Sequence, residues 1–386
     1  MENYKTTGYR NLLAELGIPQ AEIDKRVKDS FNTMFRGSAD VTLYHDSGDD
    51  MGYVEDTGNI DARTEGMSYG MMMCVQMDEH ELFDRIWKWS MTNMYMTEGH
   101  HAGYFAWSCA PDGTKNANGP APDGEEYYAM ALFFASHRWG DGEGIYNYSH
   151  WAKTILRDCI HRNGEGEKKG STMWNTENHL IKFVPDTPFS DPSYHLPHFY
   201  ELFAQWANEE DREFWSEAAK ASRKYLHSAC HPETGLCTDY AEFSGEEIAD
   251  LPWNKKHNYY YSDSYRTVMN ISLDSEWFGV DPWQSENNAR LQRFFKDAGD
   301  RWDSVPDKSG SFIDEKVMHP TAVIASNAAA SLAVFNGSCD DETEKLAKEF
   351  VMKFWNTPLR EGKRRYYDNC LYFFALLMLS GKYRIW

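Results

Sequence analysis

Residues 320–335 read PTAVIASNAAASLAVF, a stretch with small or apolar side chains on almost every face of a helix. A helix on the surface of a domain has one apolar face, whereas a helix that is apolar all round must be surrounded by other elements. The sequence repeats this character in five further stretches: 66–77, 125–136, 193–206, 262–273 and 368–380. We expect all six stretches to form inner helices.

Six amphipathic stretches alternate strictly with these inner ones: 22–35, 81–94, 149–162, 211–226, 285–298 and 341–355. Their charged faces indicate half-solvated outer helices. Each inner stretch leads to the next outer one through a short turn, and each outer stretch returns through a longer loop. The pattern predicts an all-α fold, an (α/α)6 barrel of six inner and six outer helices, in one domain of residues 1–386. A short strand pair is expected near 41–47 or 179–185.

Composition and charge restrict the partners of this chain. Hydrophobic residues make up 41%, and 14 Trp are present, so a large core is expected. A net charge of −21 opposes binding to nucleic acid or anionic lipid, which requires clustered Lys and Arg. The longest apolar run, 370–379, is too short to cross a bilayer. We therefore expect no nucleic-acid partner and no membrane association.

The cysteine and histidine patterns do not predict a metal centre or a cofactor. Seven Cys without a C-x-x-C spacing disfavour a disulfide framework and indicate a reduced compartment. The N-terminus shows no secretory signal, so a cytoplasmic protein is expected, as a monomer or a weak oligomer. The pairs His195/His198 and His100/His101 are interpreted as structural, because neither belongs to a ligand cluster in the sequence.

Polar residues stand at the starts of the inner stretches, where the long loops end. They are Glu65, Asp123, Asp191, Asp263, His319, Tyr366, Tyr367 and Asp368. Helix capping accounts for any one of these acids taken alone. It does not account for Glu65, because Glu is a poor N-cap and Thr64 is available beside it. Gly66 and Gly70 disfavour a helix, and we interpret them as sites of close approach by a ligand.

Two carboxylates without a metal-ligand cluster suggest hydrolysis of a glycosidic bond, in which one acid protonates the leaving oxygen and one base activates water. Aromatic side chains on the same loops offer flat faces that suit sugar rings. The candidate substrate-binding residues are Trp107, Tyr194, Tyr366 and Tyr367.

These residues resemble the motifs of glycoside hydrolase family 8, from about residue 40 to the C-terminus. The family's proton donor lies in a Ser/Thr-Glu-Gly-Met-x-Tyr-Gly motif, which here runs from Thr64 to Gly70. Asp123-Gly124 is similar to its central Asp-Gly, and residues 262–266 (SDSYR) are similar to its base region. The resemblance implies an inverting enzyme with Glu65 as general acid and Asp263 as base beside Arg266. Asp123 is then expected to hold the hydroxyls of the reacting sugar.

Within that family the sequence is most similar to the reducing-end xylose-releasing exo-oligoxylanases, whose cleft is closed by a loop with Leu-His-Pro. This chain has Met318-His319-Pro320. The resemblance implies release of xylose from the reducing end of short β-1,4-xylo-oligosaccharides, with His319 contacting the reducing-end sugar. Two alternatives stay open: an endo-acting xylanase or β-glucanase, and a non-catalytic sugar-binding barrel.

Overall fold

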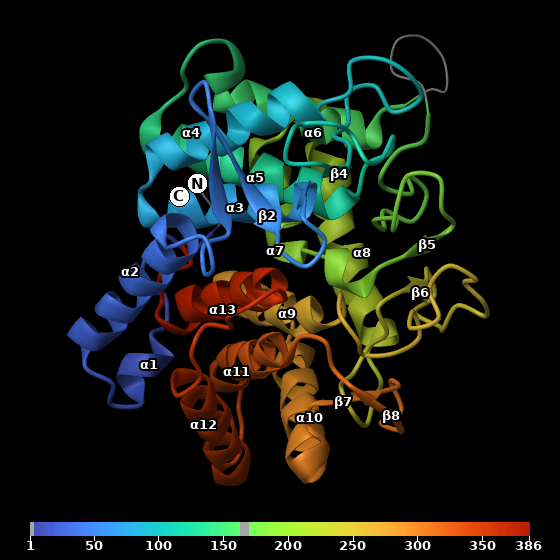
Figure 1. Cartoon of the computed structure of the whole chain (residues 1–386). Helices are drawn as coiled ribbons and strands as arrows, with labels where there is room; N and C mark the ends of the chain where they lie inside the picture. The colour runs from blue at the N-terminus through green and yellow to red at the C-terminus, as the bar shows by residue number, and fades with distance from the viewer. Residues whose placement is uncertain (1–3, 163–169) are drawn as a thin grey trace. The chain divides into compact units, whose positions relative to one another are not determined.

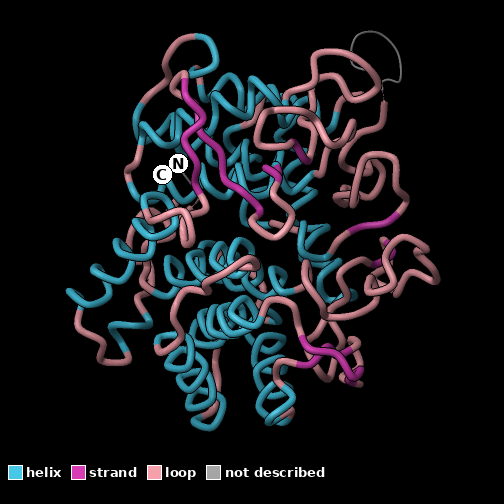
Figure 2. Tube along the Cα trace, viewed as in Figure 1, coloured by secondary structure: helices cyan, strands magenta, loops and turns pink. Residues whose placement is uncertain are grey.

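The computed structural model describes residues 4–162 and 170–386. The chain divides into two compact units. Unit 1 comprises residues 1–31, 188–198 and 219–383, and unit 2 comprises residues 32–187, 199–218 and 384–386. Helices dominate both units, and the strands are short (Figures 1 and 2).

Unit 2 contains four complete α-helices with an alternating burial pattern. They are α3 (Thr64–Met77), α4 (His80–Trp89), α5 (Pro122–Trp139) and α6 (Tyr148–Ile160), and α4 continues as the π-helix η1 (Ser90–Met94). Two short 3-10 turns, η2 (Gly144–Tyr146) and η4 (Glu209–Asp211), lie between helices. Helices α3 and α5 pack against each other and are buried on nearly all faces, whereas α4 and α6 bury one face.

An antiparallel sheet in unit 2 has the order β1 (Tyr44–Gly48), β2 (Met51–Asp56), β3 (Asp61–Arg63), β4 (Ser108–Cys109). Tyr44 is paired with Val54 across the first hairpin. The strand predicted near 41–47 is therefore confirmed. At 179–185 the structure has an isolated bridge between Trp174 and Ile181 instead of a strand pair.

In unit 1, α11 (Pro320–Asn336) packs against four other helices, as its small and apolar side chains predict. These four are α9 (Tyr265–Trp277), α10 (Trp283–Asp297), α12 (Asp341–Trp355) and α13 (Arg365–Leu379), coloured from yellow-brown to red in Figure 1. All 15 residues of α13 are buried. The remaining elements are α1 (Leu12–Glu15), η3 (Pro192–Tyr194), η5 (Gly299–Arg301), the pair β5 (Phe189–Ser190) and β6 (Ala241–Glu242), and the pair β7 (Ser304–Pro306) and β8 (Phe312–Lys316).

Three helices have residues in both units: α2 (Gln20–Arg36), α7 (Pro197–Trp206) and α8 (Arg212–Ala229). All twelve predicted helices are thus present. The stretch 193–206 differs at its start, because its helix begins only at Pro197 and is preceded by η3. Proline disfavours a helical conformation in the residue before it, which accounts for the interruption at Leu196.

The apolar run at 370–379 belongs to α13 and is part of the protein core. Across residues 4–162 and 170–386, the structure contains no helix of the length and apolarity that a membrane span requires.

Candidate active site

Glu65 lies in the first turn of α3, directly after β3. β3 pairs with β4 through Arg63 and Ser108, and the sheet therefore fixes the point at which the helix begins. The N-cap residue is Arg63, whose side chain does not cap the helix. The half-buried Glu65 side chain is thus placed by a strand that runs into a helix.

Trp107 is fixed by the same sheet. Its carbonyl accepts the Thr64 N–H at 3.0 Å, and its own N–H donates to the carbonyl of Gly119 at 3.0 Å. The Arg63 guanidinium lies 5.3 Å from the centroid of the Trp107 ring. The indole is 38% exposed, so its position beside the start of α3 leaves a face available to a ligand.

Asp123 lies in the first turn of α5 and is 5% exposed. The following residue, Gly124, determines how closely α5 approaches α3, because a Cβ at Gly124 would lie 2.4 Å from the Thr64 Cβ. The missing side chain thus brings the helix starts that carry Glu65 and Asp123 together within unit 2.

Gly70 has a different role from the one predicted. A Cβ there would lie 2.7 Å from the Val54 side chain and 3.2 Å from that of Ile86. The interpretation of Gly70 as a place for a ligand is wrong. This glycine lets α3 pack closely against β2 and α4.

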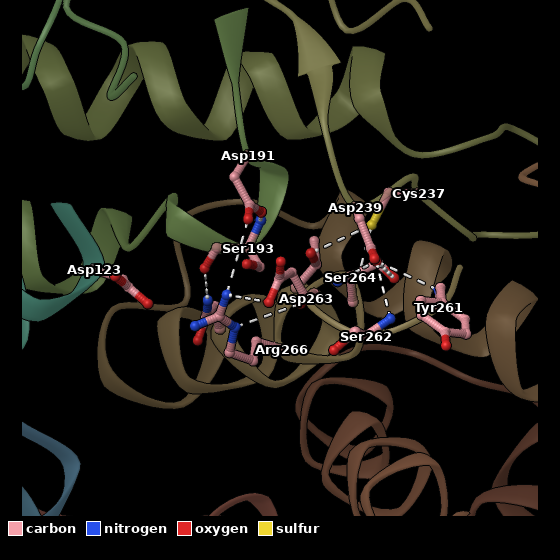
Figure 3. A network of polar contacts seen from close by, with 12 residues as sticks. Asp123, Asp191, Ser193, Cys237, Asp239, Tyr261, Ser262, Asp263, Ser264 and Arg266 are labelled. Carbon is pink, nitrogen blue, oxygen red and sulfur yellow. Dashed lines mark hydrogen bonds and ion pairs between the residues drawn. The ribbon is translucent and has the colours of Figure 1, made fainter. Parts of the chain in front are cut away.

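Asp263 and Arg266 form an ion pair at the start of α9, with 3.0 Å between Arg266 Nη2 and Asp263 Oδ1 (Figure 3). The Arg266 side chain is 5% exposed and that of Asp263 is 25% exposed. Arg266 Nη2 also lies 3.8 Å from Asp191 Oδ2, and its guanidinium lies 5.3 Å from the Tyr194 ring centroid. Three of the predicted site residues, Asp263, Arg266 and Tyr194, therefore lie together in unit 1.

Two buried carboxyl groups support this ion pair (Figure 3). Asp239 Oδ1 accepts the Ser264 hydroxyl at 2.7 Å and the N–H groups of Ser264 and Ser262 at 3.0 and 3.1 Å. Burial, followed by the negative charge of Asp263, raises the pKa of Asp239 to about 7. The same two causes raise the pKa of Asp191 well above its usual range. Arg266 pairs directly with Asp263, and Arg266 and Ser193 oppose the rise in the pKa of Asp191.

His319 is the N-cap residue of α11, and Pro320 is the first helical residue, as predicted. The imidazole Nδ1 lies 2.9 Å from Asp368 Oδ2, and Asp368 Oδ1 accepts the Ala322 N–H at 2.9 Å. Asp368 is fully buried in the first turn of α13. Arg360 donates to the Met318 carbonyl at 2.6 Å and also to Asp368. The imidazole of His319 is therefore held in one orientation.

Tyr367 connects His319 with the start of α9. Its ring packs edge-on against the imidazole at 5.0 Å, and its hydroxyl donates to the Ser262 carbonyl at 3.0 Å. Tyr366 and Tyr194 are 3% and 5% exposed, so little of either ring is open to solvent.

The predicted site residues thus form two groups. Glu65, Asp123 and Trp107 belong to unit 2, and the other predicted residues belong to unit 1. Sequence reasoning missed Asp239, which lies in a loop without a recognisable motif. The sequence does indicate Asp368, because it stands at the start of the last inner helix next to Tyr367. Only the structure shows that it holds His319.

The interpretation of His100 and His101 as a pair without a partner cluster is wrong. Asp186, which is 85 or more residues later in the chain, presents a carboxylate oxygen to both imidazoles. No residue spacing in the sequence predicts this contact.

Comparisons with known proteins identify the family. The family model described as "Glycosyl hydrolases family 8" matches residues 48–381. This chain belongs to glycoside hydrolase family 8. It is 56% identical over 384 residues to the "Reducing end xylose-releasing exo-oligoxylanase" of Halalkalibacterium halodurans, covering 99% of this chain and 96% of that protein. It is 52% identical to a protein of the same description from Bifidobacterium adolescentis, covering 98% of this chain and 97% of that protein.

A solved structure is similar to the chain along nearly its whole length. It is a mutant of Rex8A from Paenibacillus barcinonensis complexed with 3(3)-alpha-L-arabinofuranosyl-xylotetraose, with a TM-score of 0.93 and 51% identity over 98% of this chain and 96% of that one. The structural relatives in this family are (α/α)6 barrels, which confirms the predicted fold class. The chain is therefore a glycoside hydrolase of the all-α (α/α)6 class.

Proposed function

We propose that this family 8 enzyme releases xylose from the reducing end of short β-1,4-xylo-oligosaccharides, with inversion at the anomeric carbon. The observation that carries the proposal is the identity of 52–56%, over almost the whole chain, to three proteins named for this activity. The oligosaccharide bound to Rex8A belongs to the same substrate class.

Glu65 is the proposed general acid and Asp263 the proposed base. An inverting glycosidase needs one carboxylic acid that protonates the leaving oxygen and one carboxylate that activates water. The Arg266 guanidinium, 3.0 Å from Asp263, stabilises the charged form that a base requires. Asp123, brought next to the start of α3 by Gly124, is proposed to hold the hydroxyls of the reacting sugar.

His319 is the proposed contact for the reducing-end sugar. Asp368 occupies Nδ1 of the imidazole, so Nε2 is the nitrogen that remains for a substrate hydroxyl. Because Asp368 is buried and anchors α11 through Ala322, the imidazole is oriented before substrate binds. Trp107, Tyr194, Tyr366 and Tyr367 are proposed to line the sugar-binding site.

We further propose that the chain acts as one catalytic domain, as a monomer or a weak oligomer, in the cytoplasm. Six of the seven cysteines are buried as free thiols, which suits a reduced compartment.

Replacing the two carboxyl groups tests the mechanism. We expect Glu65→Gln and Asp263→Asn each to lower kcat on xylotriose by about 10²- to 10⁴-fold, the usual contribution of a positioned acid or base. Glu286→Gln on the exposed face of α10 serves as a control and should leave kcat unchanged. Full activity in either active-site variant would contradict the assigned role.

Substrate length separates the proposal from its alternatives. We expect rapid release of xylose from xylotetraose and little cleavage of polymeric xylan. Strong cleavage of xylan or of a β-glucan would favour an endo-acting enzyme. Binding of xylotetraose without turnover would favour a sugar-binding protein.

A further inference from the structure

The strongest feature outside the proposed active site is a cluster of His100, His101 and Asp186 in unit 2. One ligand atom from each residue lies within 4.8 Å of the other two. His100 Nε2 and His101 Nε2 lie 3.5 and 3.7 Å from the same carboxylate oxygen, Asp186 Oδ2. Two segments distant in sequence therefore present three metal-binding groups to one point.

The distances fit a shared ion better than they fit direct hydrogen bonds. Good hydrogen bonds from imidazole nitrogen to oxygen are about 2.7 to 3.2 Å long. Two ligands bonded at about 2.1 Å to one tetrahedral ion lie about 3.4 Å apart. The separations of 3.5 and 3.7 Å are close to this value.

Neighbouring groups orient the carboxylate and make room for the imidazoles. The Ser171 hydroxyl donates to Asp186 Oδ1 at 2.7 Å, which leaves Oδ2 directed at the histidines. Gly170 has a φ of +93°, and a Cβ there would lie 2.6 Å from the His100 carbonyl and 3.1 Å from His100 Nε2. A residue with a side chain at 170 would displace His100. Such support of ligands by surrounding groups is typical of metal sites.

The three side chains of the cluster differ in their exposure to solvent. The side chain of His101 is 16% exposed, whereas those of His100 and Asp186 are 57% and 50% exposed, so an ion can enter from solvent.

We propose that His100, His101 and Asp186 form a binding site for a divalent transition metal, with zinc as the expected ion. Two imidazole nitrogens and one carboxylate oxygen are a common donor set for zinc, and a water molecule completes the tetrahedron. The ion links the turn at 99–102 to Asp186. Because the ion binds the folded state and not the unfolded chain, it stabilises unit 2.

A cavity of about 840 Å³ adjoins the two histidines. Its lining includes one acidic and one basic side chain, Glu98 and Lys115, and the open space gives an ion access to the histidines.

Zinc titration of the tag-free, chelator-treated enzyme by calorimetry tests the proposal. We expect the wild-type chain to bind one equivalent of zinc, and His100→Gln and Asp186→Asn to bind it at least tenfold more weakly. The matched control is His227→Gln, because His227 forms a comparable surface pair with Asp281, at 2.8 Å, outside the cluster. This control should bind zinc as the wild type does.

Two outcomes would overturn the proposal. Either the wild-type chain binds no zinc, or all four chains bind it with the same affinity, which would place the ion on other histidines. His100 and Asp186 are both about half exposed, so their replacement should leave the thermal midpoint of the zinc-free enzyme unchanged. The two variants therefore test zinc binding independently of each other.

Discussion

At the scale of single residues, the roles of the carboxyl groups depend on their surroundings more than on their motifs. Asp263 is paired with Arg266 and partly exposed, whereas Asp191 and Asp239 are buried beside it and favour protonation. The motif SDSYR indicates the first of these residues. Asp239 could not be predicted, because its importance comes from four donors on residues 261, 262 and 264, which lie more than 20 positions later.

The raised pKa of Asp239 predicts a pH effect on stability. Its folded-state pKa of about 7 lies above the ordinary value of 3.8, so the folded state binds the proton more tightly than the unfolded state. This group's contribution to stability is therefore largest below pH 4 and falls as pH rises to about 7, by about 4 kcal/mol at most.

Thermal unfolding of Asp239→Asn measures this effect. An Asn retains the Oδ1 acceptor and carries no charge, so its midpoint should rise relative to that of the wild type between pH 5 and pH 8. A constant difference across that range would contradict the protonation assigned to Asp239.

Asp368 supplies a prediction for substrate recognition. Asp368→Asn weakens a charge-assisted bond to His319, and such bonds are worth about 1.5 to 3 kcal/mol. We expect kcat/KM on xylotriose to fall about 10- to 100-fold. The preference for unreduced over reduced xylotriose should also become weaker. Glu344→Gln, which removes an exposed pair with Lys348, should change neither. An unchanged preference in Asp368→Asn would show that His319 does not depend on Asp368.

At the scale of elements, the spacing of two helix starts in unit 2 depends on one missing side chain. Gly124→Ala places a Cβ against Thr64, so α5 must move away from α3. We expect a loss of about 1 to 3 kcal/mol in stability and lower activity, because Glu65 and Asp123 are separated. Glu286→Gln, on the exposed face of α10, is the control. Wild-type activity in Gly124→Ala would show that this spacing does not matter.

The helices themselves were predictable because burial leaves a periodic trace in sequence. Inner helices such as α11 and α13 lack a polar face, and outer helices such as α12 have one. The short strands β3 to β8 were not predictable, since strands of two to five residues carry no distinct period. The cluster of His100, His101 and Asp186 was also not predictable, because a contact between loops distant in sequence leaves no local pattern.

At the scale of the whole molecule, the account assigns catalytic and binding roles to residues of both units. Glu65 and Asp123 belong to unit 2, and Asp263 and His319 belong to unit 1. The family assignment rests on residues 48–381, which span both units. The central claim is therefore a joint one: inversion by two carboxyl groups and recognition of a free reducing end.

Following the product anomers by NMR during hydrolysis of xylotriose, in parallel with reduced xylotriose, tests this claim most directly. We predict that the newly formed reducing end appears first as the α-anomer from the unreduced trimer, and that the reduced trimer is cleaved far more slowly. Initial appearance of the β-anomer, or equal rates on both trimers, would contradict the account.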